Sequence, residues 1–165
     1  VPEEPDDGHR YELIDGTLIV TPAPGFRHQV VSIRLAVLLD RSCPPDLCVL
    51  AAPFAVGLGV DTEVQPDLLV APRDAFTDQD LPGAPLLAVE ILSPSTRLID
   101  LNLKRARYEE AGCASYWVVD PVALTLTAWE LVDGGYVEVA RLRPEDTWAA
   151  ELPFGVTLRP GTFLD

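Results

Sequence analysis

A buried strand followed directly by a capped helix is encoded in residues 86–97, Leu-Leu-Ala-Val-Glu-Ile-Leu-Ser-Pro-Ser-Thr-Arg. Residues 86–92 have the length and apolar character of a buried strand, interrupted by one charge, Glu90. The Ser-Pro-Ser-Thr stretch that follows ends the strand and offers a cap for a helix over residues 98–111, which Gly112 closes. A second buried strand, 115–120, comes next and ends at Pro121.

The segments around this unit predict a mixed sheet with helices packed on it. Asp15-Gly16 between two apolar runs is a strong hairpin signal. The expected elements are a hairpin of 11–14 and 17–20, a helix over 27–41, strands at 47–51, 54–57 and 64–71, a polar loop to residue 85, a hairpin of 124–131 and 136–142, and a short extension to residue 163. This order predicts an α/β (α+β) fold with a mixed central sheet flanked by helices, in one domain over residues 11–165. Residues 1–10 are acidic and proline-containing, which predicts a flexible arm.

Glu90 is unusual because it places a charge inside an apolar strand. Burial of even an uncharged polar group without a hydrogen-bond partner costs about 2–7 kcal/mol, and an unpaired carboxylate costs more. One interpretation is that the strand has a solvated face, or that Glu90 pairs with an arginine. The other is that Glu90 faces a polar cleft and binds a cation.

Asp67 is likewise a single carboxylate within a mainly apolar run, residues 64–70. Pro66 cannot donate a ladder hydrogen bond, so the strand is interrupted or lies at an edge there, which could turn Asp67 outward. If neighbouring strands bring Asp67 and Glu90 together, a divalent cation relieves their repulsion. Hard oxygen ligands in small number suit Mg²⁺ or Mn²⁺.

Lys104 is the one lysine beside eleven arginines. Where composition favours arginine so strongly, a retained lysine indicates a need for a compact ammonium on a flexible stem. The alternatives are chance retention and a surface pair with Asp100, four residues earlier on the same helix face.

The net charge of −14 argues against a broad nucleic-acid-binding surface, so any basic contact zone must be narrow. Two candidates are residues 97–107 and the row Arg27, Arg34 and Arg41, although either could be only a solvated helix face.

Three cysteines without a zinc-binding spacing, and the lack of a leader-like segment, predict a cytoplasmic protein. No apolar run approaches twenty residues, so we expect no membrane span. Whether the chain forms a homo-oligomer is left open.

Several motifs together resemble the Uma-type restriction-endonuclease family of the PD-(D/E)XK nuclease superfamily. The resemblance covers about residues 11–163 and is specific only as a set. The motifs are Glu12-Leu-Ile-Asp-Gly, Gly25 with His28, Pro66-Asp67-Leu-Leu-Val, Val89-Glu90-Ile-Leu-Ser-Pro-Ser-Thr-Arg97, Asp100 with Lys104, Tyr108 and Gly112, and Tyr116-Trp-Val-Val-Asp-Pro121.

The resemblance implies a restriction-endonuclease-like domain in which Asp67 and Glu90 bind metal, with the Ile91 carbonyl as a further ligand. The usual lysine position, two residues after the second acid, is occupied here by Leu92. Lys104 therefore matches the migrated form, in which a helix supplies the ammonium. Glu12 matches an early glutamate that helps hold metal or water in related nucleases. His28 matches as well, and both a catalytic role and a capping or core-edge role stay open for it.

These inferences give the hypothesis of a Mg²⁺- or Mn²⁺-dependent endonuclease that hydrolyses DNA. The runner-up is a nuclease-like fold without activity that serves as an interaction or regulatory module. A metal hydrolase acting on small phosphoesters is a third class left open. The chain contains no Gly-x-Ser-x-Gly elbow, P-loop or His-Glu-x-x-His motif to support the commonest rival enzyme classes.

Overall fold

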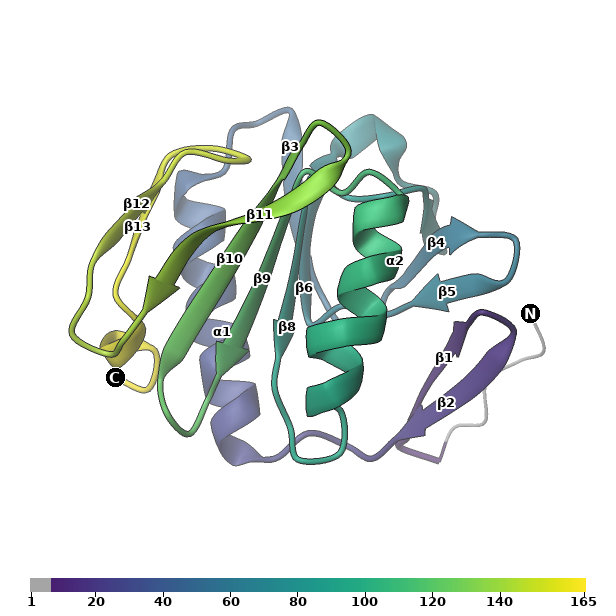
Figure 1. Cartoon of the computed structure of the whole chain (residues 1–165), viewed down its shortest axis with the longest axis horizontal. Coiled ribbons are helices and arrows are strands. Elements are labelled where there is room, and N and C mark those ends of the chain that lie inside the picture. Colours follow the sequence, from purple (N-terminus) through teal and green to yellow (C-terminus); the bar gives the residue numbers. More distant parts are fainter. Residues whose placement is uncertain (1–6) are drawn as a thin grey trace.

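The computed structural model describes residues 7–165, and a six-stranded mixed sheet forms the centre of the molecule (Figure 1). The pairing of β8 with β9 is parallel, and the other pairings within this sheet are antiparallel. In spatial order its strands are β11 (Gly135–Leu142), β10 (Thr125–Val132), β9 (Ser115–Asp120), β8 (Leu87–Ile91), β6 (Leu68–Pro72) and β3 (Leu47–Ala51).

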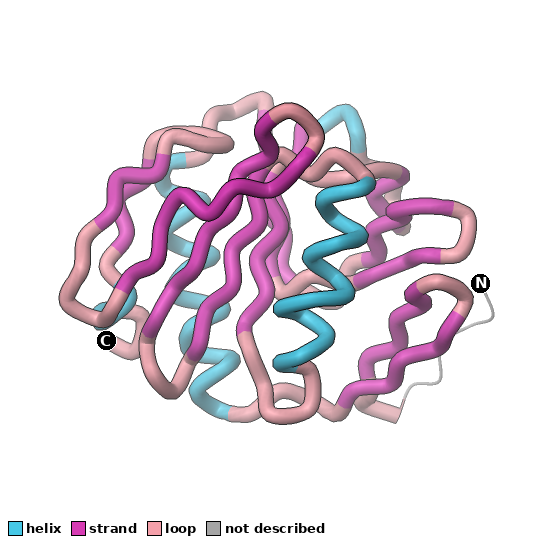
Figure 2. Tube along the Cα trace, viewed as in Figure 1, coloured by secondary structure: helices cyan, strands magenta, loops and turns pink. Residues whose placement is uncertain are grey.

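Helical segments cover the two faces of this sheet, as Figures 1 and 2 show. Helix α1 (Phe26–Ser42) buries a row of apolar side chains against one face, where Val89 and Ile91 of β8 belong to the same core. Helix α2 (Arg105–Glu110) continues a π-helical segment, Ile99–Lys104, and covers the other face. Ala88 belongs to the core on that side. Because side chains alternate along a strand, Glu90 shares the face of Ala88 and points toward α2.

A smaller five-stranded sheet lies beside the central one and supplies one wall of the site described below. Gly16, with φ of 73°, and Asp15, with φ of 52°, make the tight hairpin turn in this sheet. Its strands, in spatial order, are β2 (Thr17–Thr21), β1 (Arg10–Ile14), β5 (Thr62–Val64), β4 (Ala55–Gly59) and β7 (Asp80–Pro82). Strands β12 (Trp148–Ala150) and β13 (Val156–Leu158) form a separate pair near the C-terminus. No helix within residues 7–165 is both long and apolar enough to cross a lipid bilayer.

The predicted fold class, a mixed sheet flanked by helices, is confirmed, and the differences from the expected elements are local. The single strand expected over 64–71 is two strands, β5 and β6, because the chain leaves the ladder around Pro66. The helix expected from residue 98 begins with a π-helical turn. The loop expected before residue 85 contains β7 and the 3₁₀ turn Arg73–Ala75. Of the predicted acidic arm, residues 1–6 lie outside the described part of the chain, and strand β1 already begins at Arg10.

Candidate active site

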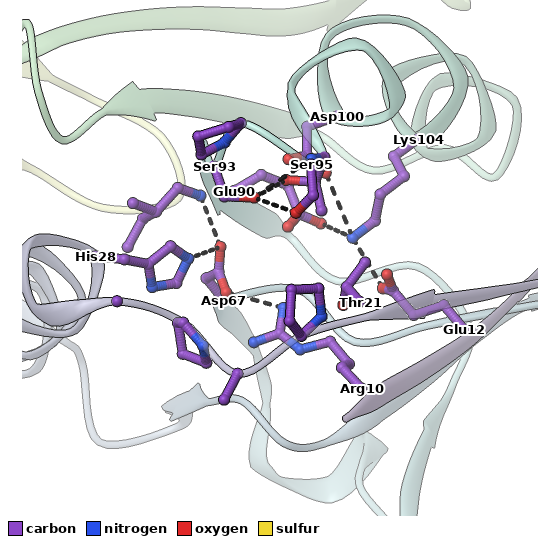
Figure 3. A pocket seen from close by; sticks show the side chains of 17 residues that line it. Arg10, Glu12, Thr21, His28, Asp67, Glu90, Ser93, Ser95, Asp100 and Lys104 are labelled. Carbon is purple, nitrogen blue, oxygen red and sulfur yellow. Dashed lines mark hydrogen bonds and ion pairs between the residues drawn. The ribbon is translucent and has the colours of Figure 1, made fainter. Parts of the chain in front are cut away.

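The structure brings the four predicted catalytic residues to one cavity of about 180 Å³, each from a different segment of the chain (Figure 3). Glu90 comes from β8, Glu12 from β1 and Lys104 from the π-helical segment, while Asp67 lies in the gap between β5 and β6. All four are deeply buried, with only 1–4% of each residue exposed. Burial of this many charges in one place requires that each has partners nearby.

Strand pairing explains why Asp67 and Glu90 meet. Strand β6 pairs antiparallel with β8, with Leu68 opposite Val89. Extending this register by one residue sets Asp67 opposite Glu90, so the two acids come from neighbouring parts of the sheet. Asp67 Oδ2 accepts a hydrogen bond of 2.7 Å from the Ile91 backbone N–H, so the carboxylate continues the sheet ladder where Pro66 has interrupted it.

Arg10 and His28 hold the Asp67 carboxylate. Arg10 Nη1 donates to Asp67 Oδ1 at 2.9 Å and to the Gln65 carbonyl at 3.2 Å. His28 Nε2, near the start of α1, lies 3.1 Å from Asp67 Oδ2. Burial opposes ionisation of Asp67, but the hydrogen bond from His28 and the charge of Arg10 keep the pKa of this carboxyl below its usual value. Asp67 is therefore ionised.

Lys104 is the central cation of the second half of the site. Its Nζ atom lies 2.6 Å from Glu90 Oε1, 2.8 Å from Glu12 Oε1 and 3.8 Å from Asp100 Oδ1. Burial would lower the pKa of Lys104, but the three carboxylates raise it above its usual value. The alternative of a surface pair with Asp100 is wrong, because Lys104 is only 1% exposed and has two closer partners.

The carboxylates around Lys104 outnumber its single positive charge. Burial and the charges of Asp100, Asp67 and Glu12 raise the pKa of Glu90 well above its usual value, against the opposing effect of Lys104. The two alternatives for Glu90, a solvated strand face and an ion pair with an arginine, are both wrong. This face of the strand is buried, and the ion-pair partner of Glu90 is Lys104. Ionisation of Glu90 is therefore disfavoured in this site, and a further cation nearby would favour it.

Asp100 gives this part of the site a predicted pH dependence. Burial raises its pKa from 3.8 to about 6, so the folded state holds the proton more tightly than the unfolded chain does. Ionisation of Asp100 as the pH rises from about 4 to about 6.5 should lower the free energy of unfolding, by up to about 3 kcal/mol. Asp100→Asn cannot ionise, so its stability relative to wild type should increase over that pH range.

Urea denaturation between pH 4.5 and 7.5, in the presence of a chelator, measures this difference. Asp78→Asn, at an exposed loop position, is the matched control. A difference between Asp100→Asn and wild type that stays constant with pH would contradict the prediction.

Arg10 is the site residue that sequence reasoning missed. It stands two positions before Glu12 in β1, and alternation along a strand sets both on one face, so this spacing was an available signal. The role of Glu12 as a partner of Lys104 also emerges only from the structure, as does the burial of the Asp100 contact. Ser93, Ser95 and Thr96 line the cavity and interact through their hydroxyl groups.

The basic surface expected over residues 97–107 is not present as such. Lys104 points inward, and Arg97 pairs with Asp120 at 2.9 Å. Arg105 lies over the ring of Trp129, 4.8 Å from its centroid, and Arg107 pairs with Asp15 and Glu110. Each cation of this segment is thus engaged within the protein.

The oxygen atoms that could bind a metal ion are those of Asp67 and Glu90, with Ile91 also lining the cavity. Across residues 7–165 no group of three or more His, Cys, Asp or Glu side chains is arranged as a metal site. Arg10, His28 and Lys104 occupy positions around these same carboxylates.

Comparison with known proteins identifies the family to which this chain belongs. No curated protein matches the chain. A crystal structure described as a putative nuclease belonging to DUF820 from Anabaena variabilis ATCC 29413 has the same fold, with a TM-score of 0.77 over 98% of this chain and 93% of that chain, at 17% sequence identity. The model of the Uma2 family, described as "Putative restriction endonuclease", matches residues 3–161. The chain therefore belongs to the Uma2 family of restriction-endonuclease-like proteins.

Proposed function

We propose that this protein is an endonuclease of the PD-(D/E)XK type that hydrolyses DNA phosphodiester bonds with Mg²⁺ or Mn²⁺. The observation that carries the proposal is the convergence of Asp67, Glu90 and Lys104 on one buried cavity. Two acids and one ammonium from separate elements meet there, although the ammonium comes from a helix and Leu92 occupies the usual lysine position. Membership of the family supports the same reaction class.

The donor set fits a hard divalent cation. The proposed ligands are the carboxylates of Asp67 and Glu90 and the carbonyl of Ile91, all oxygen donors, which Mg²⁺ and Mn²⁺ prefer. The raised pKa of Glu90 reflects burial and three nearby acids, so a divalent charge there would be stabilising. A divalent cation held by these residues would supply Lewis acidity, which polarises a phosphate and lowers the pKa of a water molecule.

The chain's own residues contribute position and charge. Arg10 and His28 hold the two oxygens of Asp67, which fixes the orientation of that carboxylate. Glu12 holds the Lys104 ammonium, and Glu12 Oε1 also accepts a hydrogen bond of 2.7 Å from the Gln65 backbone N–H. We assign to Lys104 the stabilisation of negative charge that develops on the phosphoryl oxygens.

The alternative is a nuclease-like module without activity that acts through interactions. The observation in its favour is that Lys104 and Arg10 already form ion pairs with Glu90 and Asp67. In that case the buried charges neutralise one another and bind no ion.

Cleavage of labelled single-stranded and duplex DNA, with Mg²⁺, Mn²⁺ or a chelator, tests the proposal. We expect cleavage by the wild type only with a divalent cation, and its loss in Asp67→Asn. Asp78→Asn, at an exposed position, should cleave as the wild type does. Failure of the wild type to cleave either substrate with either ion would favour the inactive module.

A further inference from the structure

The exposed side of α1 carries a row of three arginines that the proposed reaction does not use. Arg27, Arg34 and Arg41 are all exposed. Their spacing of seven residues sets them near one line along the helix, about 10.5 Å apart, over a total of about 21 Å.

These arginines lack the acidic partners that other arginines of the chain have. Within residues 7–165 no ion pair is formed by Arg27, Arg34 or Arg41. Five of the eight other arginines do form ion pairs, namely Arg10, Arg97, Arg107, Arg141 and Arg143. The sequence has 26 acidic residues against 12 Lys and Arg residues, so unpaired cations gathered along one helix are unexpected. They leave a local positive surface on a strongly acidic protein.

The row begins next to the candidate active site. Gly25, the cap of α1, and His28, in its first turn, both line the cavity. Figure 1 shows that α1 extends from there along the back of the central sheet. Large apolar side chains are exposed on the same helix, with Phe26 at 81%, Ile33 at 61% and Val37 at 45%.

We propose that the exposed side of α1 is a DNA-binding surface in which Arg27, Arg34 and Arg41 contact backbone phosphates next to the site of cleavage. This inference rests on the proposed nuclease function and names the contact surface for its substrate. Guanidinium groups bind phosphate through paired N–H donors, and each such contact releases counterions from DNA. The acidic remainder of the protein repels DNA, so the row on α1 restricts how the substrate can approach.

A second copy of the chain is a poorer occupant of this surface. A two-fold symmetric contact sets the same surface of each copy against the other. Paired α1 helices would then bring together three arginines from each copy, with Asp40 as the one acidic residue that α1 supplies per copy. Like charges opposed in this way are destabilising, whereas phosphates neutralise them.

The test compares two triple variants that each remove three positive charges. Arg27→Gln/Arg34→Gln/Arg41→Gln removes the α1 row. The matched control, Arg73→Gln/Arg141→Gln/Arg143→Gln, removes three exposed arginines that lie elsewhere. Fluorescence anisotropy with labelled single-stranded and duplex DNA, in a chelator and over a range of salt concentrations, gives the binding constants without cleavage.

We expect the α1 triple variant to bind DNA at least about tenfold more weakly at low salt, with a log–log salt slope smaller by about 2–3, and the control to resemble wild type. Equal effects of the two triples, or no DNA binding by wild type, would overturn the proposal. So would a change of oligomeric state in sedimentation for the α1 triple with unchanged DNA affinity, which would make α1 an interface between copies.

The cleavage assay separates this proposal from the proposed function. A wild type that cleaves DNA, together with an α1 triple variant that retains the wild-type KM, would overturn the α1 surface and leave the nuclease standing. A wild type that binds DNA through α1 without cleaving it would support the surface and contradict the nuclease.

Discussion

Lys104→Ala is expected to lower the free energy of unfolding by about 3–5 kcal/mol, the usual effect of removing one partner from a buried ion pair. The physical reason is that Glu12, Glu90 and Asp100 would remain buried around an empty position without their common cation. Chemical denaturation at pH 7.5 in a chelator measures the effect. Arg141→Ala, which removes an exposed cation, should leave the free energy of unfolding nearly unchanged.

Lys104 is only 1% exposed and has three acidic neighbours, so its removal should affect the stability of the fold as well as the reaction. A decrease of only a few tenths of a kcal/mol in the free energy of unfolding of Lys104→Ala would indicate that the carboxylates take up protons or that water fills the space left by the side chain.

Activity gives Lys104 a second and independent readout. At a temperature where circular dichroism shows the variants to be folded, Lys104→Ala and Lys104→Arg should both cleave DNA about 10²–10³-fold more slowly than wild type. Arginine should not restore activity, because its wide planar fork does not replace a compact ammonium with partners at 2.6 and 2.8 Å. Equal rates for all three proteins would exclude a role for Lys104 in the reaction.

The second large effect is that substitution of the two acids, Asp67 and Glu90, should change the free energy of unfolding in opposite directions. Asp67→Asn should destabilise the protein by about 1.5–3 kcal/mol, because it removes the charged acceptor of Arg10 and His28. Glu90→Gln should instead stabilise the protein at neutral pH in the absence of metal. The pKa of Glu90 is raised on folding, so its ionisation as the pH rises through and above the usual value of 4.5 opposes folding, and an amide avoids it.

A divalent ion should reverse the advantage of Glu90→Gln. Ion binding to the folded state adds about 2.7 kcal/mol of stability at one hundred times the dissociation constant, which raises the wild-type melting temperature by several degrees. Both acid variants should lose this response to Mg²⁺ and Mn²⁺.

Asp78→Asn and Glu151→Gln, at exposed positions, are the matched controls and should respond as wild type does. A wild-type melting temperature that does not move with millimolar ion would remove the support for a metal site. Destabilisation by Glu90→Gln at neutral pH would show instead that its ion pair with Lys104 outweighs the repulsion among the acids.

Local rules of sequence account well for the elements of the fold. The turn at Asp15-Gly16, the end of α1 before Pro44 and the break around Pro66 all follow from backbone preferences of single residues or pairs. The π-helical turn before α2 does not follow from such rules, because its apolar spacing is also compatible with an ordinary α-helix.

The residues of the candidate site also differ in how far the sequence alone identifies them. Glu90 and Asp67 are conspicuous in the sequence because a charge inside an apolar strand is costly, and Lys104 is conspicuous as the one lysine of the chain. Arg10 has no such contrast with its neighbours in the sequence. Its spacing from Glu12 predicts only that the two share a face of the strand, and its contact with Asp67 depends on tertiary packing.

The sequence by itself determined most of the strands and helices, and it singled out the two acids and one exceptional lysine, because these depend on local periodicity and on residue chemistry. The tertiary structure alone decided which charges meet. The partners of Lys104 lie 92 and 14 residues away in the chain, at Glu12 and Glu90, and Arg10 lies 57 residues from Asp67. Contacts over such distances depend on how the two sheets and the helices pack, and their pKa values depend on the resulting burial, so neither can be obtained from local sequence.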